Sequence, residues 1–348
     1  MGLKVIQWAT GAMGKTCLRA VIDDPGLELV GLYVYSEGKA GQDAGDIARR
    51  PPTGVIATSS IDEILALEAD VVIHAGRLPS RYGDGDGELQ RILRSGKNVI
   101  SINGHTYPQY WGGERLQAFE AACRDGGASL MGAGLNPGFI AEKIAVTATS
   151  VCTRVDWVET IETVDCRQVR NPDYVFNSLG FGADPAVVRP NDPSWPPAAA
   201  LNGMYSEVVA LTAARLGLTL DAIETEHSVS PATEDLIVAA GPIPRGRVSQ
   251  TNWRWHGLID GRRRITSTIA WVMETAHLDN PAAPLWQVRI AGSPGVRITI
   301  DLERPEGMAA RTSAEQLGLA GAVLNAIPVV CAAAPGVLAC PMATPHQG

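Results

Sequence analysis

The feature that most constrains the fold is a run of small residues near the start of the chain. Ala9-Thr10-Gly11-Ala12-Met13-Gly14 follows an apolar segment, Lys4–Trp8, and precedes an amphipathic segment, Lys15–Asp23. The spacing is that of G-x-G-x-x-G with alanine in the first place. Small residues at these positions let a strand turn sharply into a helix that packs against it. The opening of the chain is therefore predicted to be the strand, turn and helix of a βαβ unit.

The first 150 residues continue this alternation of short apolar runs and amphipathic stretches. Further strands are predicted at Leu27–Tyr35, Val71–His74, Val99–Ile102 and Ser129–Gly132. Further helices are predicted at Ile61–Leu67, Glu88–Ser95 and Arg115–Arg124. Strands that alternate with helices indicate a parallel sheet with helices on both faces. We therefore expect residues 1–150 to form an α/β domain of the doubly wound Rossmann type.

The pattern changes after about residue 150. The expected elements there are a long strand at Arg154–Asp165, a loop at 183–200, a helix at Ser206–Leu216, and two hairpins, one at 247–275 around Asp260-Gly261 and one at 286–302. The Asp-Gly dipeptide favours a tight hairpin turn. Residues 151–308 are therefore expected to form an α+β domain with a mostly antiparallel sheet. In the last segment, 309–348, the apolar stretch Ser313–Ala332 is predicted to be a helix that packs back on the first domain.

Composition and charge narrow the class of protein. The chain has 348 residues, of which 45% are hydrophobic, and a formal net charge of -8, which argues against nucleic acid as a partner. We find no apolar run of the roughly 18 residues that a membrane span needs, and the first residues resemble a strand, not a signal peptide. The six cysteines are scattered without a C-x-x-C pair, and the histidines lack metal-ligand spacing. We therefore expect a cytoplasmic protein without a metal site, acting on a small molecule.

The turn at residues 9–14 is predicted to bind the diphosphate of a nicotinamide dinucleotide. Backbone N–H groups at a helix start attract anions, and small residues let the ligand approach the backbone. An NAD site usually ends its second strand with an acidic residue that binds the ribose, but this strand ends at Tyr35 or Ser36. Ser36 and Lys39 could bind a 2′-phosphate, whereas Glu37 would favour NAD if it pointed inward. We therefore favour NADP(H), with NAD(H) as the alternative.

The ends of three further strands are expected to surround the nicotinamide, because ligands of open parallel sheets lie beyond the carboxyl ends of the strands. The residues expected there are Ala75, Gly76, Arg77, Asn103, Gly104 and Asn136. Glycine lets a flat ring approach the backbone, and asparagine offers a donor and an acceptor to a carboxamide. The alternative is that these are ordinary Gly/Asn turns.

His105 is the candidate general acid. An imidazole titrates near neutral pH and can donate a proton as a carbonyl or imine is reduced. His105 follows a strand end, and Asn103 and Tyr107 beside it complete the predicted catalytic group. The alternative is that His105 only hydrogen-bonds the loop backbone. His74, at the end of a buried strand, is expected to be a core histidine.

Several motifs resemble the dihydrodipicolinate reductase-like superfamily, and within it most closely the 2,4-diaminopentanoate dehydrogenases and the native amine dehydrogenases. The matching motifs lie at residues 5–15, 40–46, 134–139, 176–182, 216–221 and 322–328. The resemblance implies an N-terminal Rossmann domain and a C-terminal domain that encloses the substrate and forms a homodimer. It also implies reductive amination or the reverse reaction.

The sequence departs from this resemblance in two places. The double-histidine motif and the Lys-Asp-Ala-Pro-Ser-Gly run of dihydrodipicolinate reductases are absent, which argues against that activity. The glutamate that orients ammonia in amine dehydrogenases falls on Asn103 or Gly104, and neither residue can carry a charge. Glu142 and Glu162 are conceivable substitutes, although we expect both to lie on solvated faces.

Three functions remain open from the sequence. The first is an NAD(P)H-dependent oxidoreductase that transfers hydride to a small carbonyl or imine. The second is an amine dehydrogenase with a substitute for the missing glutamate. The third is a non-catalytic NADP(H)-binding sensor. Aromatic residues predict a largely apolar substrate pocket, namely Tyr107, Tyr110, Trp111, Phe139, Tyr174 and Phe176.

Overall fold

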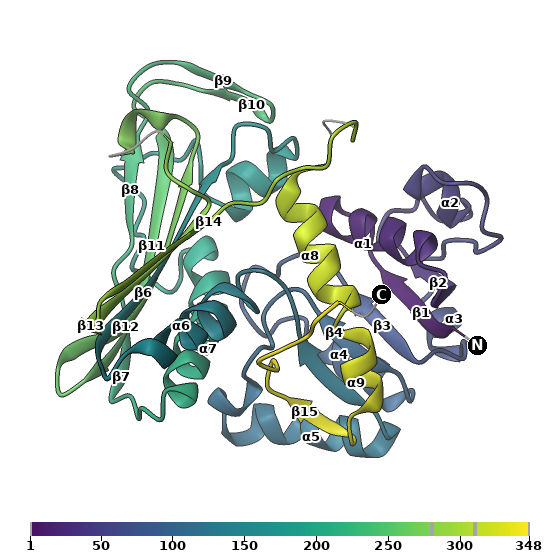
Figure 1. Cartoon of the computed structure of the whole chain (residues 1–348). Coiled ribbons are helices and arrows are strands. Elements are labelled where there is room, and N and C mark those ends of the chain that lie inside the picture. The colour runs from purple at the N-terminus through teal and green to yellow at the C-terminus, as the bar shows by residue number, and fades with distance from the viewer. Residues whose placement is uncertain (1, 279–281, 309–311, 347–348) are drawn as a thin grey trace. The chain divides into compact units, whose positions relative to one another are not determined.

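The computed structural model describes residues 2–278, 282–308 and 312–346 (Figure 1). The chain divides into two compact units. The first unit comprises Met1–Arg77, Gly85–Phe139 and Leu302–Gly348, and the second comprises Leu78–Asp84 and Ile140–Asp301. Residues 309–311, at the start of the predicted last segment, lie outside the described residues.

The first unit is built on a six-stranded sheet in the order β15-β5-β4-β3-β1-β2. Every neighbouring pair of these strands is parallel. The strands are β1 (Leu3–Trp8), β2 (Leu27–Tyr33), β3 (Val71–His74), β4 (Asn98–Ser101), β5 (Ser129–Gly132) and β15 (Gly336–Leu338). The helices are α1 (Ala12–Asp23), α2 (Ala44–Ala48), α3 (Ile61–Ala66), α4 (Asp86–Arg94), η1 (Pro108–Tyr110), α5 (Gly113–Gly126), α8 (Ala314–Leu324) and α9 (Ile327–Ala332).

Both faces of this sheet are buried, as its continuous apolar strands require. Ile6 and Trp8 of β1 belong to a core cluster that includes Phe119 of α5. Val5, one residue along the same strand, belongs to a second cluster that includes Val21 of α1. Successive residues of a strand point to opposite faces, so the two clusters lie on the two sides of the sheet. The predicted doubly wound Rossmann class is confirmed.

The end of the chain completes the first unit. α8 packs against α1, and β15 pairs with β5 at the edge of the sheet. By length and composition alone, the helical segment Ala314–Ala332 could span a membrane, the one such segment among the described residues. In the structure it is divided into α8 and α9, and Val323, Ile327 and Val330 are fully buried in a core cluster shared with strands of the sheet. The segment therefore contributes to the core of the first unit.

The second unit is built on a seven-stranded sheet in the order β14-β13-β6-β12-β11-β7, with β8 also paired to β11. All pairs are antiparallel except β12 with β6. The strands are β6 (Arg154–Asp165), β7 (Ala222–Thr225), β8 (Ser228–Pro231), β11 (Val248–Ile259), β12 (Arg262–Val272), β13 (Trp286–Ser293) and β14 (Val296–Ile300), with a separate pair, β9 (Leu236–Val238) and β10 (Gly241–Ile243). The helices are η2 (Ile140–Ala145), α6 (Val146–Ala148), η3 (Thr149–Val151), η4 (Asp173–Ser178), α7 (Pro196–Arg215) and η5 (Thr275–His277).

Both predicted hairpins are present in this sheet. Asp260 and Gly261 join β11 to β12 with φ of 51° and 68°, the positive values that a tight hairpin turn of this kind requires. Tyr205 of α7 stacks on Trp255 of β11 with ring centroids 4.5 Å apart, so this tryptophan belongs to the core. The predicted mostly antiparallel sheet is confirmed.

The structure corrects the prediction at the edges of this unit. Residues 222–243 contribute four short strands, β7 to β10, that the sequence pattern did not reveal. The predicted loop at 183–200 is wrong at its end, because α7 begins at Pro196. Proline is well tolerated in the first turn of a helix, where its missing N–H would have no helical partner.

Candidate active site

The turn after β1 shows why each small residue is needed. Ala9 adopts φ 71°, a left-handed conformation in which glycine is usually found. Gly14 lies in the first turn of α1, where an added Cβ would meet the Ala9 carbonyl oxygen at 2.4 Å and the Ala75 Cβ at 3.1 Å. Only glycine lets α1 pack this closely against the end of β1 and the loop after β3. The turn and helix are therefore locked together by contact, not by a side-chain cap.

Gly11 has the opposite environment. Gly11 is the N-cap residue of α1, and no side chain caps the helix there. A Cβ added to Gly11 would have no described atom within 4 Å. The N–H groups of the first helical turn, including those of Ala12 and Met13, have no helical partners. An open approach to unpartnered N–H groups at the positive end of a helix is suited to a diphosphate.

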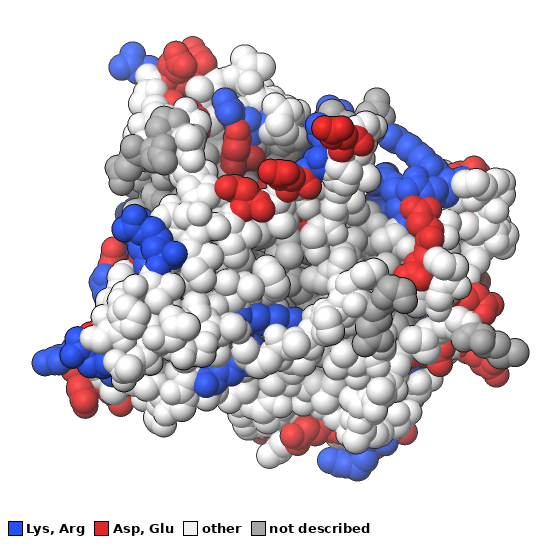
Figure 2. Space-filling view, viewed as in Figure 1, with Lys and Arg blue, Asp and Glu red and all other residues white. Residues whose placement is uncertain are grey.

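Lysine and arginine side chains gather beside this turn. The Lys39 ammonium donates hydrogen bonds to the Thr10 carbonyl oxygen at 3.2 Å and to Thr10 Oγ1 at 2.9 Å. Burial, and then the positive charges of Lys39, Arg19 and Arg49, lower the pKa of Lys15. Figure 2 shows Lys and Arg gathered over the region of α1 and α2, at the upper right of the view. The concentration of positive charge favours an anionic ligand at the turn.

The end of β2 forms a network that the sequence did not indicate. The Trp8 indole donates to the Tyr35 hydroxyl at 3.1 Å, and that hydroxyl donates to Glu88 Oε1 at 2.8 Å. His74 Nε2 lies 2.7 Å from the same Glu88 oxygen, which agrees with the prediction of a core histidine. Ser36 is exposed, and its carbonyl oxygen accepts a hydrogen bond from the Lys39 backbone N–H at 2.9 Å. An acid from α4, not from the tip of β2, is therefore the carboxylate held against Tyr35.

The loops after β3, β4 and β5 are joined to one another. Asn103 Nδ2 donates to the Gly76 carbonyl oxygen at 2.9 Å. The Gly132 N–H donates to the His105 carbonyl oxygen at 2.9 Å, and a Cβ on Gly132 would lie 2.3 Å from the Gly104 carbonyl oxygen. The structure therefore brings together the strand ends that the sequence singled out. The side chain of Asn103 contacts the loop after β3, through its hydrogen bond to Gly76.

Two other predicted residues lie at the rims of these loops. Arg77 is exposed at the end of the β3 loop. Asn136 follows β5 and precedes a cis bond to Pro137. The backbone closes tightly behind it, because Gly138 has φ 118° and its added Cβ would lie 2.7 Å from the Gly134 nitrogen. Asn136 therefore sits on a compact loop that follows the carboxyl end of β5.

His105 is enclosed by side chains. It is 5% exposed and adopts φ 62°. Its Nδ1 lies 3.2 Å from the Asn103 carbonyl oxygen and its Nε2 lies 3.9 Å from Asp86 Oδ1. Burial alone would raise the pKa of Asp86, but the neighbouring His105 imidazole and the hydrogen-bonded Arg115 guanidinium outweigh it and lower that pKa. The carboxylate therefore stays charged and holds both partners.

Aromatic rings close the remaining sides of this imidazole. Trp111 lies edge-on to His105 at 5.4 Å between ring centroids, and Phe119 lies at 6.0 Å. The Arg115 guanidinium covers the Trp111 ring at 3.7 Å. Trp111 thus packs against the first core, although the sequence predicts it in a substrate pocket. Tyr107 is half-buried, and Tyr110 is 44% exposed.

The second unit contains buried carboxylates. Glu142 is fully buried and Glu162 is 9% exposed, so the expectation that both lie on solvated faces is wrong. The Trp286 indole donates to Glu162 Oε2 at 2.7 Å. Burial, and then the charges of Glu162 and other neighbours that include Glu142, raise the pKa of Tyr205 well above its usual value. The two acids therefore act on the same buried tyrosine, which no periodicity in the sequence could reveal.

Comparisons with known proteins agree with this geometry. Residues 5–78 match the family model of the dihydrodipicolinate reductase N-terminus. An amine dehydrogenase of Streptomyces virginiae is 25% identical over 96% of this chain and 94% of its own length. A 2,4-diaminopentanoate dehydrogenase of Acetoanaerobium sticklandii is 24% identical over 96% of this chain and 91% of its own length.

A solved structure is similar over almost the whole chain. The amine dehydrogenase from Mycobacterium smegmatis has a TM-score of 0.79 and 20% identity, covering 98% of this chain and 95% of its own. These matches confirm the predicted resemblance, and at this identity the structural match speaks for the fold. Both curated relatives are dehydrogenases by name, in agreement with the prediction of an NAD(P)-dependent oxidoreductase.

Proposed function

We propose that this protein is an NAD(P)H-dependent oxidoreductase that reduces the carbonyl or imine carbon of a small substrate, or catalyses the reverse oxidation. The observation that carries the proposal is the turn at residues 9–14. Gly14 is closed by the Ala9 carbonyl and Ala75, while Gly11 is open at an uncapped helix start. This is the division of roles that a dinucleotide diphosphate requires.

The dinucleotide would supply a hydride, and the substrate oxygen or nitrogen would take a proton. The chain's own residues would bind and orient. The backbone N–H groups of residues 11–14 would hold the diphosphate, and the linked loops after β3, β4 and β5 would position the reactive ring. Asn136 and Gly104 are the proposed contacts to that ring, and the hydrogen bond from Asn103 to Gly76 would keep two of the loops in register.

Within this function we favour NADP(H). Lys39 is fixed on Thr10 at the edge of the turn, and Lys15 and Arg49 add positive charge beside it. A 2′-phosphate carries more negative charge than a ribose hydroxyl and gains more from such a field. Glu37 is the residue that would favour NAD(H), and it is exposed. A dissociation constant for NADPH no lower than that for NADH would contradict this preference.

His105 remains a candidate for the general acid that donates the proton, and we add positioning of the β4 loop as its second candidate role. Its ring is held by Asp86 and the Asn103 carbonyl, and Trp111 and Phe119 pack against its edges. This environment supports positioning of the β4 loop, and the half-buried Tyr107, two residues along the chain, is the second candidate for proton transfer. His105→Gln and Tyr107→Phe separate the roles. Loss of a general acid lowers turnover roughly 100-fold and changes the pH profile, whereas loss of a positioning residue weakens NADPH binding at unchanged profile.

The second candidate function is amine dehydrogenation, and the buried acids of the second unit are the observation in its favour. A carboxylate in an enclosed site can accept a proton from an ammonium group. Glu142 and Glu162 are enclosed in this way. Glu142→Gln and Glu162→Gln would then abolish reductive amination while leaving NADPH binding intact.

One assay set tests these alternatives. The purified protein receives NADPH or NADH with a panel of ketones and aldehydes, with and without concentrated ammonium. Oxidation of the cofactor without ammonium supports carbonyl reduction, and strict ammonium dependence supports amine dehydrogenation. Tight binding of the cofactor without any turnover would support the sensor function and contradict the enzymatic proposal.

We also propose that the protein is a cytoplasmic homodimer, formed through the sheet of the second unit. Exposed sheet faces of this kind commonly pair across a two-fold axis. Residues on the edge strand β14 alternate between half-buried and exposed, so one face of that strand is available. Analytical ultracentrifugation at micromolar concentration should show a dimer, and a monomer would contradict this assembly.

A further inference from the structure

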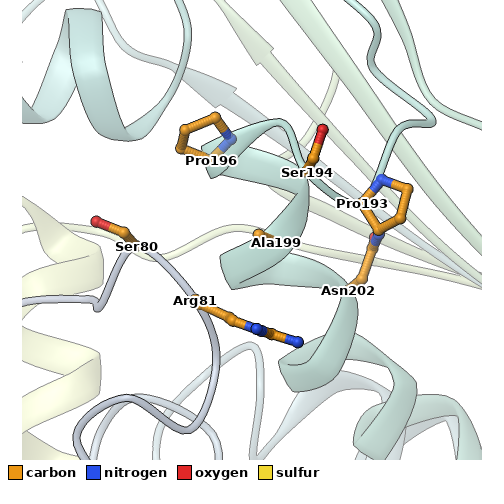
Figure 3. A pocket seen from close by; sticks show the side chains of 7 residues that line it. All are labelled: Ser80, Arg81, Pro193, Ser194, Pro196, Ala199 and Asn202. Carbon is orange, nitrogen blue, oxygen red and sulfur yellow. The ribbon is translucent and has the colours of Figure 1, made fainter.

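A cavity in the second unit has a chemistry that the dinucleotide site does not explain. It has a volume of about 600 Å³ and is lined by Ser80, Arg81, Pro193, Ser194, Pro196, Ala199 and Asn202. The first two residues come from the segment Leu78–Asp84, and the others come from α7 and the residues just before it. Figure 3 shows the Arg81 side chain extending toward the turn of α7 that carries Asn202. A volume of this size is within the range of small-molecule sites.

The orientation of Asn202 is fixed by its neighbours. The Trp255 indole, which can only donate, lies 3.0 Å from Asn202 Oδ1, and His227 Nε2 lies 2.8 Å from the same oxygen. The Arg254 backbone N–H donates to His227 Nδ1 at 3.2 Å, so Nε2 is the nitrogen that carries the proton. Burial, and then the charge of His256, lower the pKa of His227 to about 4, which keeps the ring neutral. Asn202 therefore uses its oxygen for the protein and has its Nδ2 donors left for the cavity.

Arg81 supplies the positive charge of the cavity lining. Its guanidinium makes no hydrogen bond or ion pair with any residue in the described part of the chain, and the residue is exposed. None of the lining residues is acidic. α7 begins at Pro196, so the positive end of a 20-residue helix also faces this region. The polar groups whose orientation is known therefore offer donors and positive charge.

Apart from the hydroxyl groups of Ser80 and Ser194, which can donate or accept hydrogen bonds, the rest of the lining is apolar. Pro193, Pro196 and Ala199 present hydrocarbon surface and no side-chain donor or acceptor. A ligand that matches both the donor groups and the apolar surface of the cavity needs an anionic head with at least two acceptor oxygens and a short apolar body. A planar carboxylate suits the forked donors of a guanidinium better than a spherical anion does.

We propose that this cavity is a binding site for a small amphipathic carboxylate, with its head between Arg81 and Asn202 and its apolar part against the proline and alanine surfaces. The site lies wholly within the second unit, and the inference does not depend on the dinucleotide. It assigns to the protein a ligand class that the fold and the resemblance do not imply.

Isothermal titration calorimetry of the full chain with hexanoate and with hexanamide tests the proposal. The two probes share an apolar body and differ in charge. Hexanoate should bind at least about tenfold more tightly, because a charge-assisted hydrogen bond contributes more than a neutral one. Equal affinities, or no binding of hexanoate at millimolar concentration, would overturn the proposal. The titration is made without dinucleotide, and NADPH binding is measured separately on the same sample, so failure of one proposal is distinct from failure of the other.

Variants locate the site. Arg81→Gln should weaken hexanoate binding about tenfold, while Arg170→Gln, which removes an exposed arginine outside the lining, should leave it unchanged. Asn202→Asp keeps an acceptor for Trp255 and His227 but replaces the donors with a second negative oxygen, and it should abolish binding. Melting temperatures show that each variant folds. Hexanoate affinity that is unchanged in both Arg81→Gln and Asn202→Asp would place the carboxylate elsewhere and refute the assignment.

Discussion

The two glycines of the first turn should respond to the same substitution in opposite ways. In Gly14→Ala the new methyl group would lie 2.4 Å from the Ala9 carbonyl oxygen and 3.1 Å from the Ala75 Cβ. The first distance is far below van der Waals contact, so α1 must move away from the backbone at the end of β1. In Gly11→Ala the methyl group meets no described atom within 4 Å, and φ of -64° is open to any residue.

The expected magnitudes follow from these environments. Overpacking of a rigid site costs about 1–3 kcal/mol, so Gly14→Ala should lower the free energy of unfolding by that amount. For a unit of this size, that corresponds to a fall in melting temperature of roughly 3–10 °C. Gly11→Ala replaces only a helix N-cap and should cost less than about 1 kcal/mol. Its methyl group would stand where the diphosphate approaches, so its dissociation constant for NADPH should rise at least about tenfold.

Urea unfolding and NADPH titration of both variants measure these effects. Unfolding is followed by the fluorescence of the chain's eight tryptophans, of which Trp8 is fully buried beside the turn. Wild-type stability in Gly14→Ala would show that the helix does not need its close contact with β1. Wild-type NADPH affinity in Gly11→Ala would show that the ligand does not pass over this residue, and the proposed site would be wrong.

Other substitutions test the remaining parts of the first unit. Lys39→Ala should weaken NADPH binding about tenfold and NADH binding much less, because the ammonium is fixed on Thr10 at the rim of the turn; equal losses in titration would remove Lys39 from the choice of cofactor. Asp86 has a lowered pKa, so the stability that it contributes should be present above its unfolded pKa of about 3.9 and be lost as the pH falls through its lower folded value. The difference in urea stability between wild type and Asp86→Asn should therefore be large at pH 7 and shrink below about pH 4, and a difference independent of pH would contradict this. Asn103→Ala should raise the dissociation constant for NADPH several-fold by freeing the Gly76 carbonyl, whereas a fall in turnover alone would point to a direct role in the reaction.

The parts of the fold that the sequence predicts are those set by local geometry. The turn at residues 9–14 and the hairpin at Asp260-Gly261 depend on a few adjacent small residues, and both are present. β15 has only three residues and exists as a strand because β5 offers it an edge. Such a strand leaves no periodic pattern in the sequence, and the same is true of β7 to β10.

The site is predictable to a similar extent. The strand-end loops are local features, and the sequence places Gly76, Asn103 and Gly104 together correctly. The burial of Glu142 and the network of Tyr35 with Glu88 depend on elements that are distant along the chain. The orientation of the Asn202 amide at the cavity depends on the His227 tautomer, which the Arg254 backbone N–H determines. Relations of this kind are set by tertiary packing, which a single sequence does not display.

The place of β15 has a consequence for how the protein is made. Ser129 Oγ donates to the Ala334 carbonyl oxygen at 3.0 Å, and the Gly336 N–H donates to the Ala128 carbonyl oxygen at 3.1 Å. The edge of β5 is thus covered by a strand that is synthesised about two hundred residues later. Throughout translation of the intervening two hundred or so residues, β5 exposes an unpaired edge, which is a known route to aggregation. Synthesis of β15 is therefore the step that covers this edge of the first unit.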